Sequence, residues 1–180
     1  MKIIGLAGSL RKASYNKSLL QAALNLAPKG MSIEVFELNE IPLYNKDVEI
    51  QGFPEAVMQL REKIADSDGV LIVTPEYNHS IPGVLKNAID WVSRPPKQPF
   101  SGKPIAIMGG SDGGFGTVRA QMALRIVFAT LNGYLMPSPQ LPVSYVDKKF
   151  DEEGKLIDEN TKEKLSKFLQ AFVIWVEKFA

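Results

Sequence analysis

The sequence contains no cysteine and only one histidine among its 180 residues. The absence of cysteine excludes disulfides, thiolate nucleophiles, cysteine zinc sites and iron–sulfur clusters. A single histidine also disfavours a histidine-based metal centre. We therefore expect no bound metal.

The chain also lacks an excess of charge of either sign, because its formal net charge is +1. Nucleic-acid binding calls for a strong basic excess, and dedicated electron carriers often dock through an acidic surface. No stretch reaches the roughly 18 apolar residues that a membrane span needs, and the apolar start is too short for a signal peptide. We expect no nucleic-acid partner, no membrane association and a cytoplasmic location.

What the sequence does contain is an ordinary globular composition, with 45% hydrophobic and 23% charged residues. This length and composition predict one domain over residues 1–180.

Short apolar runs alternate with segments of helical periodicity along the whole chain. Strands are expected over 2–7, 32–38, 69–74 and 103–109, with a weaker signal over 134–136 that resumes over 141–146. Helices are expected over 16–27, 54–66, 82–93, a segment of about 15 residues from Thr117, and 161–179, and 39–53 is expected as loop. The alternation predicts an α/β fold, namely a flavodoxin-like three-layer sandwich with a five-stranded parallel sheet of order 2-1-3-4-5.

In such a sheet, ligands bind beyond the carboxyl ends of the strands, at the point where the strand order reverses. That point lies between the first and third strands. The loops over 8–18, 75–82 and 110–117 are therefore expected to build the functional site.

The first of these loops, GSLRKASYNKS, is rich in groups that bind anions. It carries hydroxyl or amide side chains at Ser9, Ser14, Asn16 and Ser18, a basic side chain at Arg11, and it opens a helix whose N-terminus attracts anions. A phosphate monoester fits this set, although a capped strand-to-helix turn with solvated basic residues uses the same residue types. Neither GxxxxGK[ST] nor GxGxxG occurs, which disfavours a nucleoside-triphosphate or dinucleotide site.

The other two loops suit a flat ring. TPEYNHSIPG places an aromatic side chain (Tyr77) beside an amide (Asn78), and GGSDGGFG has five glycines in eight residues, which permits close backbone approach. A surface turn and a flexible loop remain the alternatives. For His79, two interpretations stay open: a proton donor or a solvated side chain.

Three segments together resemble the NAD(P)H-dependent FMN reductase family, which includes quinone, chromate and azo-dye reductases. They are GSLRKASYNKSL, TPEYNHSIPGVLKNAIDWVSR and KPIAIMGGSDGGFGTVRAQ, and the likeness covers nearly the whole chain. The resemblance implies that Ser9, Arg11, Asn16 and Ser18 bind the FMN phosphate, that Pro75, Glu76, Tyr77 and Asn78 hold the isoalloxazine ring, and that Ser111 with its glycine neighbours lines the far side of the ring.

The same resemblance implies an activity. NADPH or NADH passes a hydride to the flavin, and a quinone, azo dye, chromate or similar acceptor then takes the electrons, with no catalytic residue supplied by the protein. Family members are homodimers or homotetramers. Independently, the helix after Thr117 is apolar on almost every side, which predicts a covering partner subunit, with Trp91 joining the covered surface.

Two other functions stay open. A flavodoxin-type electron carrier would share the fold, although Arg11 and the near-zero net charge are atypical of that class. A flavin-free regulatory domain that has kept the fold is the third possibility.

Overall fold

A parallel sheet forms the centre of the protein, whose computed structural model describes residues 1–179. Its strands are β1 (Lys2–Ala7), β2 (Ser32–Phe36), β3 (Gly69–Val73), β4 (Pro104–Gly110), β5 (Tyr134–Leu135) and β6 (Leu141–Val143). The strand order is β2-β1-β3-β4-β5, with β6 also paired to β4. The predicted flavodoxin-like order is therefore confirmed.

The edge beyond β4 is shared by two short strands instead of one long strand. β5 pairs with the start of β4 at Pro104 and Ile105, whereas β6 pairs with its end at Met108, Gly109 and Gly110. The intervening PSPQ segment contains two prolines, which have no N–H to donate to a ladder. We expected a single fifth strand beside β4. The structure has two short strands there, one after the other along β4, so the sheet has six strands.

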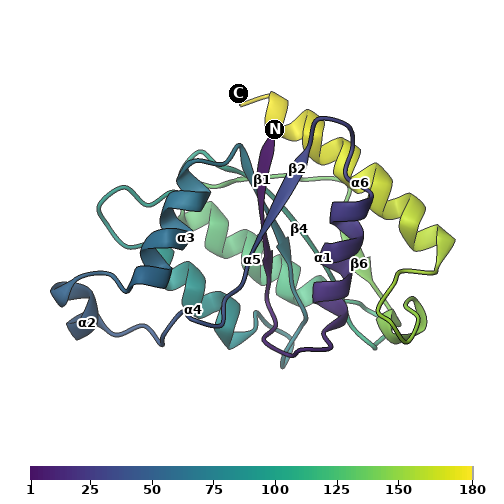
Figure 1. Cartoon of the computed structure of the whole chain (residues 1–180), viewed down its shortest axis with the longest axis horizontal. Helices are drawn as coiled ribbons and strands as arrows, with labels where there is room; N and C mark the ends of the chain where they lie inside the picture. Colours follow the sequence, from purple (N-terminus) through teal and green to yellow (C-terminus); the bar gives the residue numbers. More distant parts are fainter. Residues whose placement is uncertain (180) are drawn as a thin grey trace.

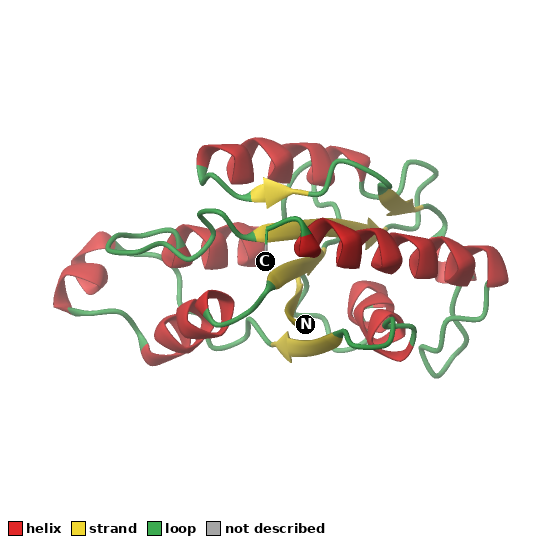
Figure 2. Ribbon diagram, turned by 90° about the horizontal axis from the view of Figure 1, so that it is seen from above, coloured by secondary structure: helices red, strands yellow, loops and turns green. Residues whose placement is uncertain are grey.

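Two helical layers enclose the sheet, as Figures 1 and 2 show. The long helices are α1 (Tyr15–Asn25), α3 (Glu55–Ala65), α4 (Gly83–Val92), α5 (Val118–Thr130) and α6 (Glu159–Glu177). Helices α1 and α6 pack on one face, where Leu71 and Phe172 share a core cluster. Helices α3, α4 and α5 pack on the other face, where Ile72 and Phe128 share a second cluster. No helix within residues 1–179 is both long enough and apolar enough to cross a membrane.

The segment 39–53 is not entirely loop, because it contains the short helix α2 (Lys46–Gln51). The Asn45 side chain caps this helix by accepting a hydrogen bond from the Asp47 N–H at 2.9 Å. None of the residues of α2 is buried, so the helix has no apolar stripe from which it could have been predicted.

Trp91 does not join an outer surface, so that expectation is wrong. Its side chain is fully buried, and its ring packs edge-on against Tyr44 and Phe53. Its indole N–H donates a hydrogen bond to the Pro42 carbonyl at 2.8 Å. The apolar side chains of the segment 39–53 cover Trp91 from within the same chain.

Helix α5 has one buried side and one exposed apolar side. Leu124 and Phe128 are fully buried, whereas Met122 is 51% and Ile126 is 71% exposed. Val118 is also exposed on this helix. These three exposed side chains are spaced four residues apart and so lie on one side of the helix.

Candidate functional site

A hollow of about 160 Å³ lies at the carboxyl edge of the sheet, where the strand order reverses. It is lined by Ser9, Arg11, Ser14, Tyr15, Asn16, Pro75, Glu76, Tyr77, Gly110, Ser111, Asp112 and Val146. All three predicted loops contribute to this lining. Within residues 1–179 no cluster of three or more potential metal ligands occurs.

The N-terminus of α1 lines this hollow. The N-cap residue Ser14 makes no side-chain capping bond, and the first turn carries no acidic residue. Among the described residues, no acceptor is found for the backbone N–H groups of Tyr15, Asn16 and Lys17. Free N–H groups at the positive end of a helix dipole form an anion-binding position.

Further donors stand beside this helix end. The side chain of Ser9 is buried, and its hydroxyl accepts a hydrogen bond from the Arg11 N–H at 3.3 Å. The Arg11 side chain is exposed, and no carboxylate of the described residues lies within salt-bridge distance of it. A guanidinium without an internal partner is available to grip an anionic ligand.

Asn16 lies in the hollow but has a structural task. Its side-chain N–H₂ donates to the Gly110 carbonyl and its oxygen accepts from the Gly110 N–H, both at 2.9 Å. The residue is only 4% exposed. These paired bonds fix the start of α1 to the end of β4, so both polar atoms of the Asn16 side chain are used within the protein.

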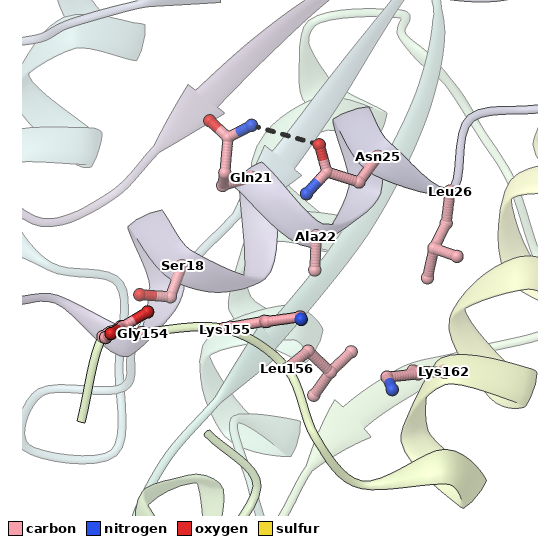
Figure 3. Close-up of a pocket in the computed structure, with 10 residues that line it drawn as sticks. Ser18, Gln21, Ala22, Asn25, Leu26, Gly154, Lys155, Leu156 and Lys162 are labelled. Carbon is pink, nitrogen blue, oxygen red and sulfur yellow. Dashed lines mark hydrogen bonds between the residues drawn. The ribbon is translucent and has the colours of Figure 1, made fainter. Parts of the chain in front are cut away.

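Ser18, the fourth residue expected at the phosphate, lies elsewhere. It lines a separate cavity of about 320 Å³ between α1, α6 and the loop before α6 (Figure 3). Lys155 and Lys162 also line that cavity, together with Glu153, and Lys162 pairs with Glu159 at 2.6 Å. With Glu159 included, the formal charges of these four side chains sum to zero.

The loop after β3, residues 74–83, makes a tight turn; it is called the ring loop because it is expected to hold the flavin ring. Tyr77 and Ser80 exchange backbone hydrogen bonds at 3.2 and 3.0 Å across a two-residue connection. The connecting residues, Asn78 and His79, both have positive φ angles, of 50° and 61°. Asparagine tolerates this conformation better than most residues. Tyr77 stays at the hollow with its side chain half exposed, whereas Asn78 and His79 do not contribute to the lining.

Glu76 directs its carboxylate away from solvent, since its side chain is only 9% exposed. One oxygen accepts hydrogen bonds from the N–H groups of Arg119 and Ala120, at 2.8 and 3.0 Å. Burial raises the pKa of Glu76, but the hydrogen bonds from Ala120, His79 and Arg119 outweigh it and hold that pKa below its ordinary value. The group is therefore an ionised carboxylate at neutral pH.

Glycines allow the loops to meet. A Cβ atom at Gly109 would lie 1.9 Å from the Thr74 carbonyl oxygen, and one at Gly110 would lie 2.6 Å from the Val146 side chain. The glycine loop, GGSDGGFG at residues 109–116, is held by the Ser111 hydroxyl, which donates a hydrogen bond to the Gly116 carbonyl at 2.6 Å. The wall formed by this loop therefore has a defined shape.

Sequence reasoning missed two lining residues. Tyr15 begins α1 and packs against Phe150, with ring centroids 5.9 Å apart. Val146 follows β6, and its N–H donates to the Ser111 carbonyl at 3.1 Å. The signal for Val146 was available, because β6 also ends at the carboxyl edge of the sheet.

Comparison with known proteins decides the family. The sequence model of the family described as NADPH-dependent FMN reductase matches residues 1–148. The chain belongs to this family. It is thus an oxidoreductase whose cofactors are FMN and NAD(P)H, and the predicted enzyme class and cofactors are confirmed.

Members of the FMN reductase family are similar to this chain over almost its full length. An NAD(P)H-dependent FMN reductase of Pseudomonas aeruginosa is 50% identical over 178 residues, which cover 99% of this chain and 96% of that protein. A 2-hydroxy-1,4-benzoquinone reductase of Burkholderia is 44% identical and covers 98% of this chain and 96% of its own length. The solved structure of FerB, a flavoenzyme NAD(P)H:(acceptor) oxidoreductase of Paracoccus denitrificans, superimposes with a TM-score of 0.90 at 36% identity, covering 98% and 97% of the two chains.

Proposed function

We propose that the chain holds the FMN phosphate at the open N-terminus of α1 and transfers electrons from NAD(P)H to a quinone. The observation that carries this proposal is the contrast between the N-terminus of α1, which lines the hollow, and the N-terminus of α5, which is bonded to the lining residue Glu76. The N-terminus of α5 is filled by the Glu76 carboxylate, whereas the N-terminus of α1 has free N–H groups with Arg11 beside it. A dianionic phosphate is attracted to the second position and repelled from the first.

In this proposal Ser9, Ser14 and Arg11 bind the phosphate together with the backbone N–H groups of α1. Pro75 and Tyr77 offer an apolar and aromatic surface for the ring, and the glycine loop at Ser111 offers the facing wall. Bound FMN supplies the hydride chemistry. The protein's own task is to bind, orient and shield the cofactor.

A small quinone is the acceptor that we propose, with azo dyes and chromate as further candidates. The name of the Burkholderia relative, 2-hydroxy-1,4-benzoquinone reductase, supports a quinone. The formal net charge of +1 also disfavours the carrier alternative, which docks protein partners through an acidic surface. We further propose that the reaction takes place in the cytoplasm.

We also propose that the protein is a homodimer or a homotetramer. Val118, Met122 and Ile126 are exposed on one side of α5, and Phe115, at the end of the glycine loop, is 71% exposed. A second copy is the partner that a closed symmetric assembly would supply for this surface.

An anaerobic experiment tests the proposed activity. FMN bound to the protein should lose its visible absorption on addition of NADPH or NADH and regain it on addition of benzoquinone. Steady-state rates should then follow ping-pong kinetics. Bound FMN that neither nicotinamide reduces would favour the carrier alternative, and a protein that binds no FMN would favour the regulatory one.

A further inference from the structure

Helix α5 follows the glycine loop that lines the hollow, and its N-cap residue, Thr117, makes no side-chain capping bond of its own. Instead, the Thr117 hydroxyl is buried and accepts a hydrogen bond from the Gln121 side-chain amide at 3.0 Å. The first turn carries no acidic residue either. A helix of 13 residues thus begins without local satisfaction of its N–H groups.

Glu76 supplies the missing cap from a different loop. Its Oε2 atom accepts both the Arg119 and the Ala120 N–H, and its Oε1 atom lies 3.6 Å from the Arg119 guanidinium. Glu76 and Arg119 are 43 positions apart in sequence. The carboxylate therefore joins the loop after β3 to the start of α5, which follows the glycine loop.

We propose that Glu76 is a positioning residue of the flavin site, which holds the ring loop and the glycine-loop wall at a fixed separation by capping α5. This inference rests on the proposed function. It assigns to the Glu76 side chain a role different from direct contact with the isoalloxazine ring. One carboxylate oxygen accepts both N–H groups of α5, and the other lies 3.5 Å from His79 Nδ1 and 3.6 Å from the Arg119 guanidinium.

The proposal separates two classes of binding residue. Arg11 acts at the phosphate and therefore affects only flavins that carry one. Glu76 sets the width of the ring site and therefore affects FMN and riboflavin equally. Without the Glu76 cap, the loop after β3 must be ordered when the flavin binds. The cost of this ordering should raise the Kd for either flavin by about five- to tenfold.

The test compares two substitutions in the whole protein. We expect Glu76→Ala to raise the Kd for FMN and for riboflavin by the same factor, about five- to tenfold. Glu76→Gln keeps an oxygen that accepts the two N–H groups, and we expect it to restore most of the affinity. Hydrogen exchange of the Arg119 and Ala120 amides, measured without flavin, should be faster in Glu76→Ala than in wild type and Glu76→Gln.

A matched control separates positioning from general stability. Asp158 caps α6, accepting from the Thr161 N–H at 2.9 Å, and it is absent from the lining of the hollow. Asp158→Ala should cost similar stability and leave both flavin affinities unchanged.

Unchanged flavin binding in Glu76→Ala would overturn the inference about Glu76 and leave the proposed function standing. The same would follow if Glu76→Ala lost affinity for FMN only, or if Asp158→Ala lost as much affinity as Glu76→Ala. Failure of the wild-type protein to bind either flavin would overturn the proposed function as well.

Discussion

Arg11 offers a direct way to separate phosphate binding from ring binding. Its side chain is exposed and has no carboxylate partner among the described residues. The Arg11 backbone N–H donates a hydrogen bond to the Ser9 hydroxyl, and this bond does not depend on the Arg11 side chain. Replacement of Arg11 by alanine should therefore change the free energy of unfolding by less than about 0.5 kcal/mol.

The effect on FMN binding should be much larger. A hydrogen bond between charged partners contributes about 1.5–3 kcal/mol, and each 1.4 kcal/mol is tenfold in Kd. Arg11→Ala should therefore raise the Kd for FMN by about ten- to 150-fold. Riboflavin has no phosphate, so its Kd should change by less than about twofold.

Flavin fluorescence titrations with both ligands measure these constants, and Lys12→Ala is the matched control. Lys12 is the neighbouring exposed cation but does not line the hollow, so its loss removes only long-range attraction. Equal effects of the two substitutions on FMN, or equal effects of Arg11→Ala on FMN and riboflavin, would refute the phosphate assignment.

Three further predictions concern packing, pH and association. Gly109→Ala should lower the free energy of unfolding in urea by at least about 1–3 kcal/mol, because its Cβ meets the Thr74 carbonyl, whereas Gly83→Ala, with nothing within 4 Å, should be neutral. The pKa of Asp158 is lowered from 3.8 to about 2, mainly by the hydrogen bond from the Thr161 hydroxyl and next by the hydrogen bond from Lys149. The folded-state pKa therefore lies below the unfolded one. The stabilisation that Asp158 provides is fully present above about pH 3.8 and should be lost as the pH falls through about 2. Asp158→Asn should show no such loss. Light scattering should give a dimer or tetramer that Ile126→Lys weakens; a wild-type monomer would contradict the interface.

The order of the elements could be predicted because it depends on local patterns. The run GVLIV is apolar at every position, and in the sheet β3 is buried on both faces. Its ends follow from Gly69 and Pro75, which the sequence displays directly. The loops at the carboxyl edge then follow from topology, and they do line the hollow.

The direction of individual side chains could not be predicted in the same way. Asn16 and Ser18 lie two positions apart on α1, which is a rotation of about 200° around a helix. One side chain therefore meets β4 and the other lines a separate cavity. Composition placed both residues in the first loop segment, but only the phase of the helix decides which of them faces the hollow.

The hydrogen-bond partners of Glu76 at the start of α5 also could not be predicted from the sequence. Any carboxylate near the site can be assigned to a ligand, to solvent or to a helix end. The choice depends on the N-terminus of α5 lying within hydrogen-bond distance, and that placement results from long-range packing between the ends of β3 and β4.

The central claim, that FMN places its phosphate at the N-terminus of α1, is tested most directly by the backbone amide resonances of isotopically labelled protein. On titration with FMN, the resonances of Tyr15, Asn16 and Lys17 should shift downfield, and titration with riboflavin should leave them nearly unchanged. The amides of Arg119 and Ala120, already bonded to Glu76, should not respond to the phosphate. Shifts specific to FMN at Arg119 and Ala120, with none at residues 15–17, would contradict the account.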